Sequence, residues 1–230
     1  MSRLDDPVAV REEYANEDRL ARRKAGYRFA EGPDPRELAF AAVAEAKPRR
    51  ILEVGCGEGE LAERMVRELG ADVVAVDQSE RMVELTRARE IEARVGDVLD
   101  LPFADGEFDV AVAAWMLFHV SDIDRALSEL ARVAPRLVAV TNGTDHLREL
   151  YELLGTDRLQ FTFSAEQAED DLSRHFARVE RRDASGWIAF PDRATAQEFV
   201  DAFIILRGEL PPFEGGLRVR RTPYVFLADR

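Results

Sequence analysis

The sequence predicts an α/β fold built on a doubly wound, mostly parallel sheet. Short apolar runs alternate with segments of helical periodicity, as they do in successive strand–helix–strand units. A glycine-rich loop joins the first apolar run to a helix. Two late strand patterns, at 176–182 and 217–227, indicate an antiparallel edge. The length of 230 residues suits one domain better than two separate cores.

Composition narrows the class of protein. No apolar run approaches the roughly 20 residues that a membrane helix needs, and Met1–Pro7 lacks the apolar segment of a signal peptide. Cys56 is the one cysteine, which excludes an internal disulfide and a cysteine-based metal site. A formal net charge of −13 disfavours nucleic acid as a partner. We therefore expect a cytoplasmic protein, monomeric or homodimeric, without membrane or nucleic-acid partners.

The elements follow one another with few interruptions. Ser79 is expected to cap the helix after the second strand, and Ser121 or Asp122 the helix after the fourth. In chain order, the patterns predict a charged helical segment over 10–30, a helix over 38–46, strands at 51–54 and 73–77, a short third strand that begins at Val95, strands at 108–114 and 137–140, and helices at 146–154, 165–176 and 194–206.

The loop after the first strand reads Glu53-Val-Gly-Cys-Gly-Glu-Gly59. Glycines at 55, 57 and 59 allow a tight turn and bring a ligand close to the main chain. A dinucleotide fingerprint would place its third glycine at position 60, where this chain has Glu60. An NAD-binding module is therefore disfavoured. The E-x-G-x-G-x-G form resembles motif I of class I S-adenosylmethionine (SAM)-dependent methyltransferases.

The resemblance continues along residues 48–140. Asp77 ends the second strand, Asp97 follows the third, residues 108–114 are similar to motif IV, and the segment from His119 to Val133 keeps the family order. It implies a Rossmann-like, seven-stranded, mostly parallel sheet with an antiparallel edge hairpin, in three α/β/α layers. It also implies SAM as cofactor and S-adenosylhomocysteine as product. Ala134–Leu137 departs from the family by losing paired glycines, which affects a turn distant from the cofactor.

The resemblance assigns cofactor residues one by one. Each carboxylate also has a purely structural interpretation. Glu53 could hold the loop through backbone N–H groups, Asp77 could cap a helix and Asp97 could be a turn residue. For Cys56, a small buried residue without chemistry is the favoured interpretation. The implied set comprises Glu53, Gly55, Cys56, Gly57 and Gly59 for the methionine end, Asp77 and Gln78 for the ribose, Asp97 and Val98 for the adenine, Ala113 and Ala114 near the sulfur, and Met82.

Acceptor chemistry is less specified by the sequence. His119 follows the fourth strand and titrates near neutral pH, so it is the candidate general base, with a packing role as the alternative. Trp115 could form an apolar substrate wall, and Asn142 and His146 could orient a substrate. The alternative for the latter loop is that Thr144 or Asp145 caps the next helix. Tyr14 and Arg23 fall where the family places a lid. No metal is expected.

These patterns predict transfer of a methyl group from SAM to an oxygen or nitrogen of a small molecule. Methylation of a protein or ribosomal RNA is the alternative enzyme reading, and a non-catalytic SAM-binding regulatory domain is the alternative outside enzymes. We expect one domain over 1–230, with an N-terminal helical lid at 1–47, a SAM-binding core at 48–143 and a substrate-shaping part at 144–230.

Overall fold

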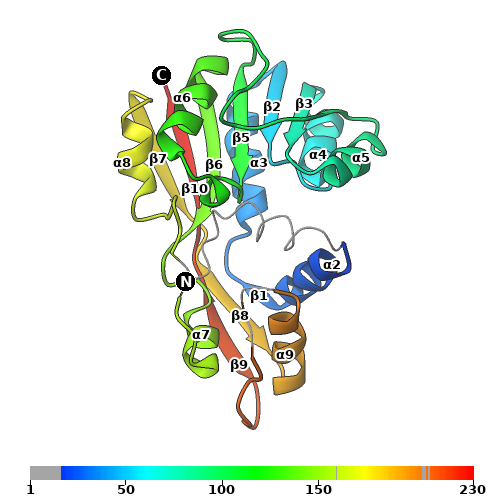
Figure 1. The fold of residues 1–230 in the computed structure, drawn as a ribbon, viewed down its shortest axis with the longest axis vertical. Coiled ribbons are helices and arrows are strands. Elements are labelled where there is room, and N and C mark those ends of the chain that lie inside the picture. Colours follow the sequence, from blue (N-terminus) through cyan, green and yellow to red (C-terminus); the bar gives the residue numbers. More distant parts are fainter. Residues whose placement is uncertain (1–16, 159, 204–205, 207) are drawn as a thin grey trace.

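The computed structural model describes residues 17–158, 160–203, 206 and 208–230. Within these residues the main layer is a seven-stranded sheet (Figure 1). Five neighbouring strands are parallel, and β10 runs antiparallel to both β6 and β7. The order across the sheet is β4 (Glu92–Val95), β3 (Asp72–Asp77), β2 (Arg50–Val54), β5 (Val110–Ala114), β6 (Arg136–Asn142), β10 (Pro223–Asp229) and β7 (Arg178–Asp183).

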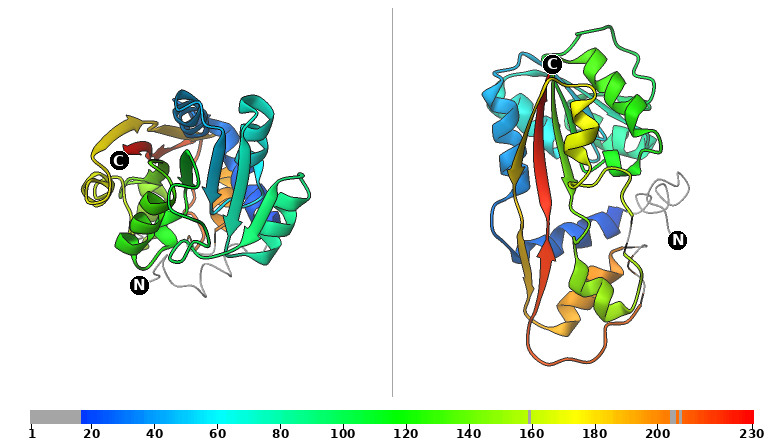
Figure 2. Two further views of the ribbon diagram at one scale, coloured as in Figure 1. Left: turned by 90° about the horizontal axis from the view of Figure 1, so that it is seen from above. Right: turned by 90° about the vertical axis from the view of Figure 1, so that its left-hand side faces the viewer.

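Helices cover both faces of this sheet (Figure 2). On one face α3 (Pro35–Glu45), α4 (Glu60–Leu69) and α5 (Glu80–Arg87) bury apolar side chains against alternate strand residues. On the other face α6 (Ile123–Val133) and α8 (Ala168–Ser173) pack against the remaining strand positions. The central strands are apolar on both sides because each side is covered, which is why they read as continuous apolar runs. The predicted α/β layers are confirmed.

Side-chain caps fix where several helices begin. Ser79 accepts a hydrogen bond from the Met82 N–H at 3.3 Å, as predicted. Asp122, rather than Ser121, caps α6 by accepting from the Arg125 N–H at 3.0 Å. The cap predicted at Thr144 or Asp145 is wrong. The helix α7 (Arg148–Leu154) starts after Leu147, which adopts a left-handed φ of 57° without a side-chain cap.

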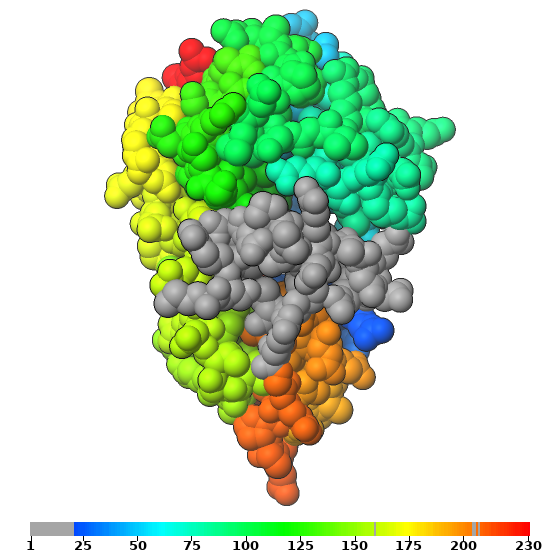
Figure 3. Space-filling view, in the orientation of Figure 1, coloured from blue at the N-terminus to red at the C-terminus, as the bar shows by residue number. Residues whose placement is uncertain are grey.

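A second, three-stranded sheet was not predicted. It pairs β1 (Ala30–Glu31), β8 (Gly186–Phe190) and β9 (Leu217–Arg221), and it forms the tapered lower end with its helices (Figures 1 and 3). We call this part the small lobe. Its apolar cluster draws residues from α7, β8, α9 (Arg193–Asp201) and β9, and α2 (Glu17–Gly26) and the short helix η1 (Tyr27–Phe29) adjoin it.

The small lobe explains the corrections in the last third of the chain. The strand predicted over 217–227 is two strands, β9 and β10, in different sheets. The break falls at Thr222, whose N–H bonds to a side chain and whose C=O accepts from the Gly143 N–H. Pro223, which has no N–H, then begins β10. The predicted antiparallel edge is confirmed, but β7 and β10 are separated in sequence by the small-lobe excursion.

Some boundaries also differ in the main sheet. The third strand was expected to begin at Val95, whereas β4 ends there. It is an edge strand with one buried residue, so its apolar signal is weak. Among the described residues, no helix combines the length and apolar character needed to cross a membrane.

Candidate functional site

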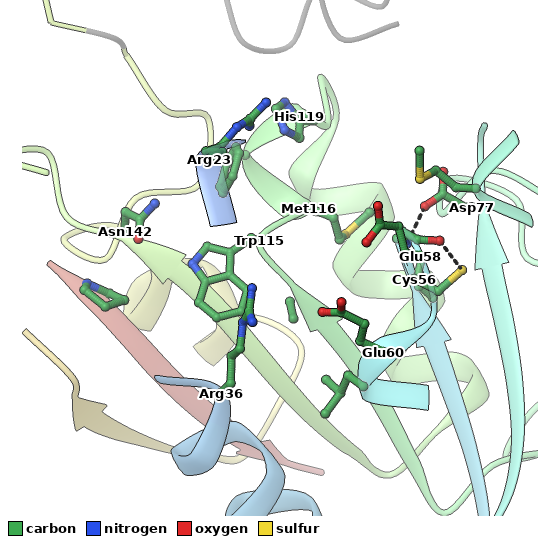
Figure 4. A pocket seen from close by; sticks show the side chains of 18 of the residues that line it. Arg23, Arg36, Cys56, Glu58, Glu60, Asp77, Trp115, Met116, His119 and Asn142 are labelled. Atoms are coloured by element: carbon green, nitrogen blue, oxygen red, sulfur yellow. Dashed lines mark hydrogen bonds between the residues drawn. The ribbon is translucent and has the colours of Figure 1, made fainter. Parts of the chain in front are cut away.

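A cavity of about 1650 Å³ lies at the carboxyl ends of the central strands. Its walls come from the loops after β2, β3, β4, β5 and β6, and from α2, η1 and β9 on the small-lobe side (Figure 4). Ligands collect at this edge in doubly wound sheets, because the loops leave a crevice where neighbouring connections diverge to opposite faces. The cavity therefore occupies the place where the sequence puts its candidate site residues.

The glycine loop forms one wall of this cavity. Gly55, Gly57 and Gly59 have φ values of 71°, 54° and 75°, a left-handed conformation that side chains disfavour. A Cβ on Gly55 would lie 2.6 Å from Met116, and one on Gly59 would lie 2.8 Å from Thr86. At Gly57 a Cβ would meet nothing within 4 Å, although this residue lines the cavity. Gly57 is thus the position where the main chain is open to a ligand.

Two carboxylates lie beneath this loop. Glu53 is 3% exposed, and its Oε2 has no hydrogen-bond partner among the described residues. Burial raises the pKa of the Glu53 carboxyl to about 8, and the nearby charge of Asp77 acts in the same direction. Asp77 accepts hydrogen bonds from the N–H groups of Gly57 (3.0 Å) and Ser79 (2.9 Å). A buried carboxyl group with one oxygen left without a hydrogen-bond partner favours a ligand that is cationic or donates a hydrogen bond.

The loop after β4 forms the far end of the same wall. Asp97 is exposed and accepts from the Leu99 N–H at 2.9 Å, so its turn role is present. Val98 is buried, while Val95 leaves 53% of its surface exposed and lines the cavity. Met82, from α5, also lines it. An apolar surface next to a turn carboxylate suits a flat heterocycle with an exocyclic amine.

The segment after β5 enters the cavity from the opposite side. Trp115 has a φ of 55°, a strained value for a bulky side chain, and its N–H donates to Val140 O at 2.9 Å. Its indole projects into the middle of the cavity in Figure 4. His119, on η2 (Leu117–His119), lies on the rim, with its ring 4.4 Å from that of Phe118.

A polar group occupies the small-lobe side. Asn142 ends β6, is 9% exposed, and has no partner for Oδ1 among the described residues. His146 accepts from the Thr222 N–H at Nδ1 (3.0 Å), so the proton of the neutral ring is on Nε2, 3.4 Å from the Tyr27 hydroxyl. Desolvation, followed by the charge of Arg221, lowers the pKa of His146 to about 3. His146 is therefore a neutral hydrogen-bonding residue near pH 7.

Comparison with known proteins assigns the fold and loop to a family. The family described as "Methyltransferase domain" (methyltransferase type 11) matches residues 52–136, the span that carries the glycine loop, Asp77, Asp97 and Trp115. This span is a methyltransferase type 11 domain, of the class I SAM-dependent methyltransferase kind.

The curated relatives of this chain are named for different acceptors. It is 35% identical over 136 residues to a rice (Oryza sativa subsp. japonica) protein named "Probable tocopherol O-methyltransferase, chloroplastic", covering 53% of this chain and 38% of the relative. It is 36% identical over 105 residues to the demethylmenaquinone methyltransferase of Symbiobacterium thermophilum, covering 41% and 42%. The matches thus span less than half the length of these relatives.

A solved structure matches nearly the whole fold. A Thermotoga maritima SAM-dependent methyltransferase, described as a possible histamine N-methyltransferase, superposes with a TM-score of 0.62, covering 94% of this chain and 96% of that one. At 21% identity this likeness shows the fold alone.

Most of the residues assigned from the sequence line the cavity. Two do not. Ala113 faces away into the core because successive strand residues point to opposite faces, and Gly59 packs against Thr86. Tyr14 lies outside the described residues. Those that do line it are Arg23, Glu53, Gly55, Cys56, Gly57, Asp77, Gln78, Met82, Asp97, Val98, Ala114, Trp115, His119, Asn142 and His146.

Several residues that line the cavity were not predicted from the sequence. Lys24, on α2, pairs with Glu58 and, at 2.8 Å, with Glu60, so this helix is fastened to the glycine loop. Arg221 enters from the small lobe, which no periodic pattern in the sequence predicted. Cys56 is buried beside Thr86, and burial raises the pKa of its thiol to about 12, which disfavours nucleophilic chemistry. Among the described residues, no cluster of three metal-ligating side chains occurs.

Proposed function

We propose that this protein transfers a methyl group from SAM to an oxygen or nitrogen of a small-molecule acceptor. The observation that carries the proposal is the open space above Gly57. It is bordered by Asp77 and by Glu53, whose Oε2 has no hydrogen-bond partner among the described residues. SAM supplies a methyl group activated by a sulfonium, and the residues around this space have the chemistry to hold its parts.

The cofactor residues divide along the wall. Glu53 and the loop at Gly55–Gly57 would bind the methionine end. The ammonium group of SAM would donate a hydrogen bond to Glu53 Oε2, and its positive charge would stabilise the ionised carboxylate. Asp77 would accept from a ribose hydroxyl, since its two oxygens together offer about four acceptor sites and receive backbone hydrogen bonds from Gly57, Ser79 and Gln78. Asp97 would accept from the adenine amine. Gln78 is proposed to assist Asp77 at the ribose.

The same wall supplies the apolar contacts. Val98, Val95 and Met82 would enclose the adenine, because they present apolar surface beside Asp97. Ala114 would lie near the sulfur at the end of β5. Its small side chain leaves room for the methyl group and the incoming nucleophile.

On the acceptor side, the protein's task is orientation and proton removal. Methyl transfer is an in-line displacement, so the nucleophile must lie about 3 Å from the methyl carbon on a collinear path. The Trp115 indole is proposed as a wall that fixes the acceptor, and the strained backbone at this residue is consistent with a functional constraint. His119 is proposed to take the proton of a hydroxyl acceptor, whereas a neutral amine needs positioning alone.

The surrounding segments would complete the pocket. Helix α2 is proposed as a lid, because Lys24 ties it across the glycine loop through Glu58 and Glu60. Residues 144–230 would shape the acceptor site, since β9 and the loop after β6 both line the cavity. A small acceptor is favoured over a macromolecule by a net charge of −13 and by a cavity walled on the small-lobe side.

Two measurements test the proposal. Calorimetric titration with SAM and with S-adenosylhomocysteine should give dissociation constants on the order of micromolar, about −8 kcal/mol. Transfer of labelled methyl from SAM should then be screened over small alcohols, phenols and amines, with ribosomal RNA and whole-cell protein as the competing substrates. SAM binding without turnover on any of them would support a regulatory domain instead, and failure to bind either ligand would refute the proposal.

A further inference from the structure

Arg221 is a buried cation in the wall of the cavity. It ends β9, is 3% exposed, and lines the cavity on the small-lobe side. The hydrogen bonds of its guanidinium run from Nη2 to two main-chain carbonyls, those of Glu31 (3.1 Å) and Pro33 (2.6 Å). Its enclosed Nε has no partner among the described residues. This side chain therefore keeps unused donor capacity in a place that water hardly reaches.

No carboxylate forms an ion pair with Arg221 within the described part of the chain. The negative charge of Asp34 stabilises the protonated form of Arg221 without an ion pair. The Asp34 carboxylate instead caps α3 by accepting from the Arg36 N–H at 2.8 Å. Burial is the main cause that lowers the pKa of Arg221. An unpaired buried charge is costly unless a ligand offsets it, and a guanidinium gives up its proton reluctantly.

Two neutral hydrogen-bonding residues, His146 and Asn142, line the cavity together with Arg221. His146 holds its proton on Nε2, because the Thr222 N–H occupies Nδ1, so it adds no charge. Asn142 presents a buried Oδ1 that lacks a partner among the described residues, and its side chain lies in the cavity in Figure 4. This part of the wall offers one positive charge together with neutral hydrogen-bonding groups.

Several other cations on the cavity wall have partners, and Arg23 and Arg28 lie over the rings of Phe203 and Phe29. Lys24 contacts Glu58 and Glu60, and Arg64 contacts Glu37 at 2.6 Å. The glycine-loop side, by contrast, carries the Glu53 and Asp77 acids. The cavity thus has carboxyl groups on the glycine-loop side, and the small lobe contributes the Arg221 guanidinium to another part of its wall.

We infer that Arg221 binds a carboxylate carried by the acceptor molecule, which rests on the proposed function of the cavity. A single guanidinium matches a monovalent anion, whereas a dianionic phosphate would leave excess negative charge in a buried place that Asp34 already influences. Asn142 accepts a donor elsewhere on the same acceptor. The acceptor is therefore a small organic acid, methylated on a hydroxyl or amine distant from its carboxylate.

Matched pairs of acids and primary amides test this inference. Benzoic, 4-hydroxycinnamic, indole-3-acetic and octanoic acids, each with its amide, and phenyl phosphate are titrated into protein saturated with S-adenosylhomocysteine. At least one acid should bind tenfold or more tightly than its amide, a difference of about 1.4 kcal/mol. The inference is overturned if no acid is preferred, or if phenyl phosphate alone binds.

Variants of β9 locate the effect. Arg221→Gln should abolish the preference for the acid and leave affinity for the amide unchanged. Arg218→Gln removes the same charge from the same strand, at a side chain that is 60% exposed and paired with Glu31, and should keep the preference. A preference that survives Arg221→Gln contradicts the inference. Should that variant not fold, Arg221→Lys takes its place. It keeps the charge but loses the planar fork, so it should weaken the preference severalfold, and an undiminished preference would again contradict the inference.

Titration with S-adenosylhomocysteine alone separates the two proposals. Binding of this ligand with no acid preference refutes the role of Arg221 and leaves the methyltransferase proposal standing. Acid binding that depends on Arg221, in protein that does not bind S-adenosylhomocysteine, refutes the proposed cofactor site and leaves the anion site standing.

Discussion

Cofactor binding should release a proton from Glu53. In the free protein, burial raises the pKa of this carboxyl to about 8, so at pH 7 about one-tenth of the molecules carry the ionised form. The ammonium group of SAM stabilises the carboxylate and lowers its pKa. Binding at pH 7 should therefore release about 0.9 proton per ligand, because nine molecules in ten must lose one.

The same linkage sets the pH dependence of affinity. Since the ionised form binds and it becomes more populated as pH rises toward 8, affinity should increase about ninefold from pH 6 to pH 7. This window lies below the pKa of the ligand's own α-amino group, about 7.7–8.0 for such groups, so the ligand's charge stays constant. The increase should end near pH 8, and affinity should fall above it, because the ligand's ammonium group then loses its proton.

Calorimetry in two buffers of different ionisation enthalpy, phosphate and Tris, measures the released proton directly. The observed heats should differ by the difference in buffer enthalpy multiplied by about 0.9. Glu53→Gln should abolish both this difference and the pH dependence. Identical heats in the two buffers, or an unchanged pH profile in Glu53→Gln, would show that Glu53 is not the proton source and would remove it from the cofactor site.

Three substitutions test the remaining roles. Gly57→Val should abolish SAM binding, because the side chain enters the open space of the cavity from a backbone with φ 54°. Asp77→Ala should weaken SAM binding at least tenfold by removing a charged acceptor, and equilibrium titration of the variant measures this. His119→Ala should lower the turnover of a hydroxyl acceptor by about 10²–10⁴-fold and leave SAM affinity nearly intact, as steady-state kinetics and titration would show.

Each substitution has a matched control outside the cavity. Gly106→Val places the same side chain on a backbone with φ 66° and open space around it, so it carries a similar backbone strain. Asp109→Ala removes a carboxylate that also accepts two backbone N–H groups, at 2.7 and 2.9 Å. His175→Ala removes a histidine bound to Asp124. A control that impairs binding or turnover as much as its partner would assign the effect to stability instead of the site.

The parallel core could be predicted because local pattern and buried position agree there. Residues 51–54 and 73–77 are strands with both faces covered, so their apolar runs needed no further information. The glycine loop could be predicted as well, because a left-handed φ strongly favours glycine. Val95, on a half-covered edge strand, gave a weak signal, and the boundary there was wrong.

The small lobe could not be predicted, because its sheet forms between segments far apart in the chain. β1 pairs with β8, and β8 with β9, so residue 30 meets residue 188. Pairings of this kind leave no local periodicity. Arg221 ends β9 of this sheet, directly before the break at Thr222, so its place in the cavity wall could not be predicted either.

A crystal structure with S-adenosylhomocysteine tests the central claim most directly. The account predicts the adenine beside Asp97 and Val98, the ribose hydroxyls on Asp77, and the amino group of the ligand on Glu53 above Gly57. Density for the ligand elsewhere on the protein, or a ligand in this cavity that leaves Glu53 and Asp77 without contact, would contradict it.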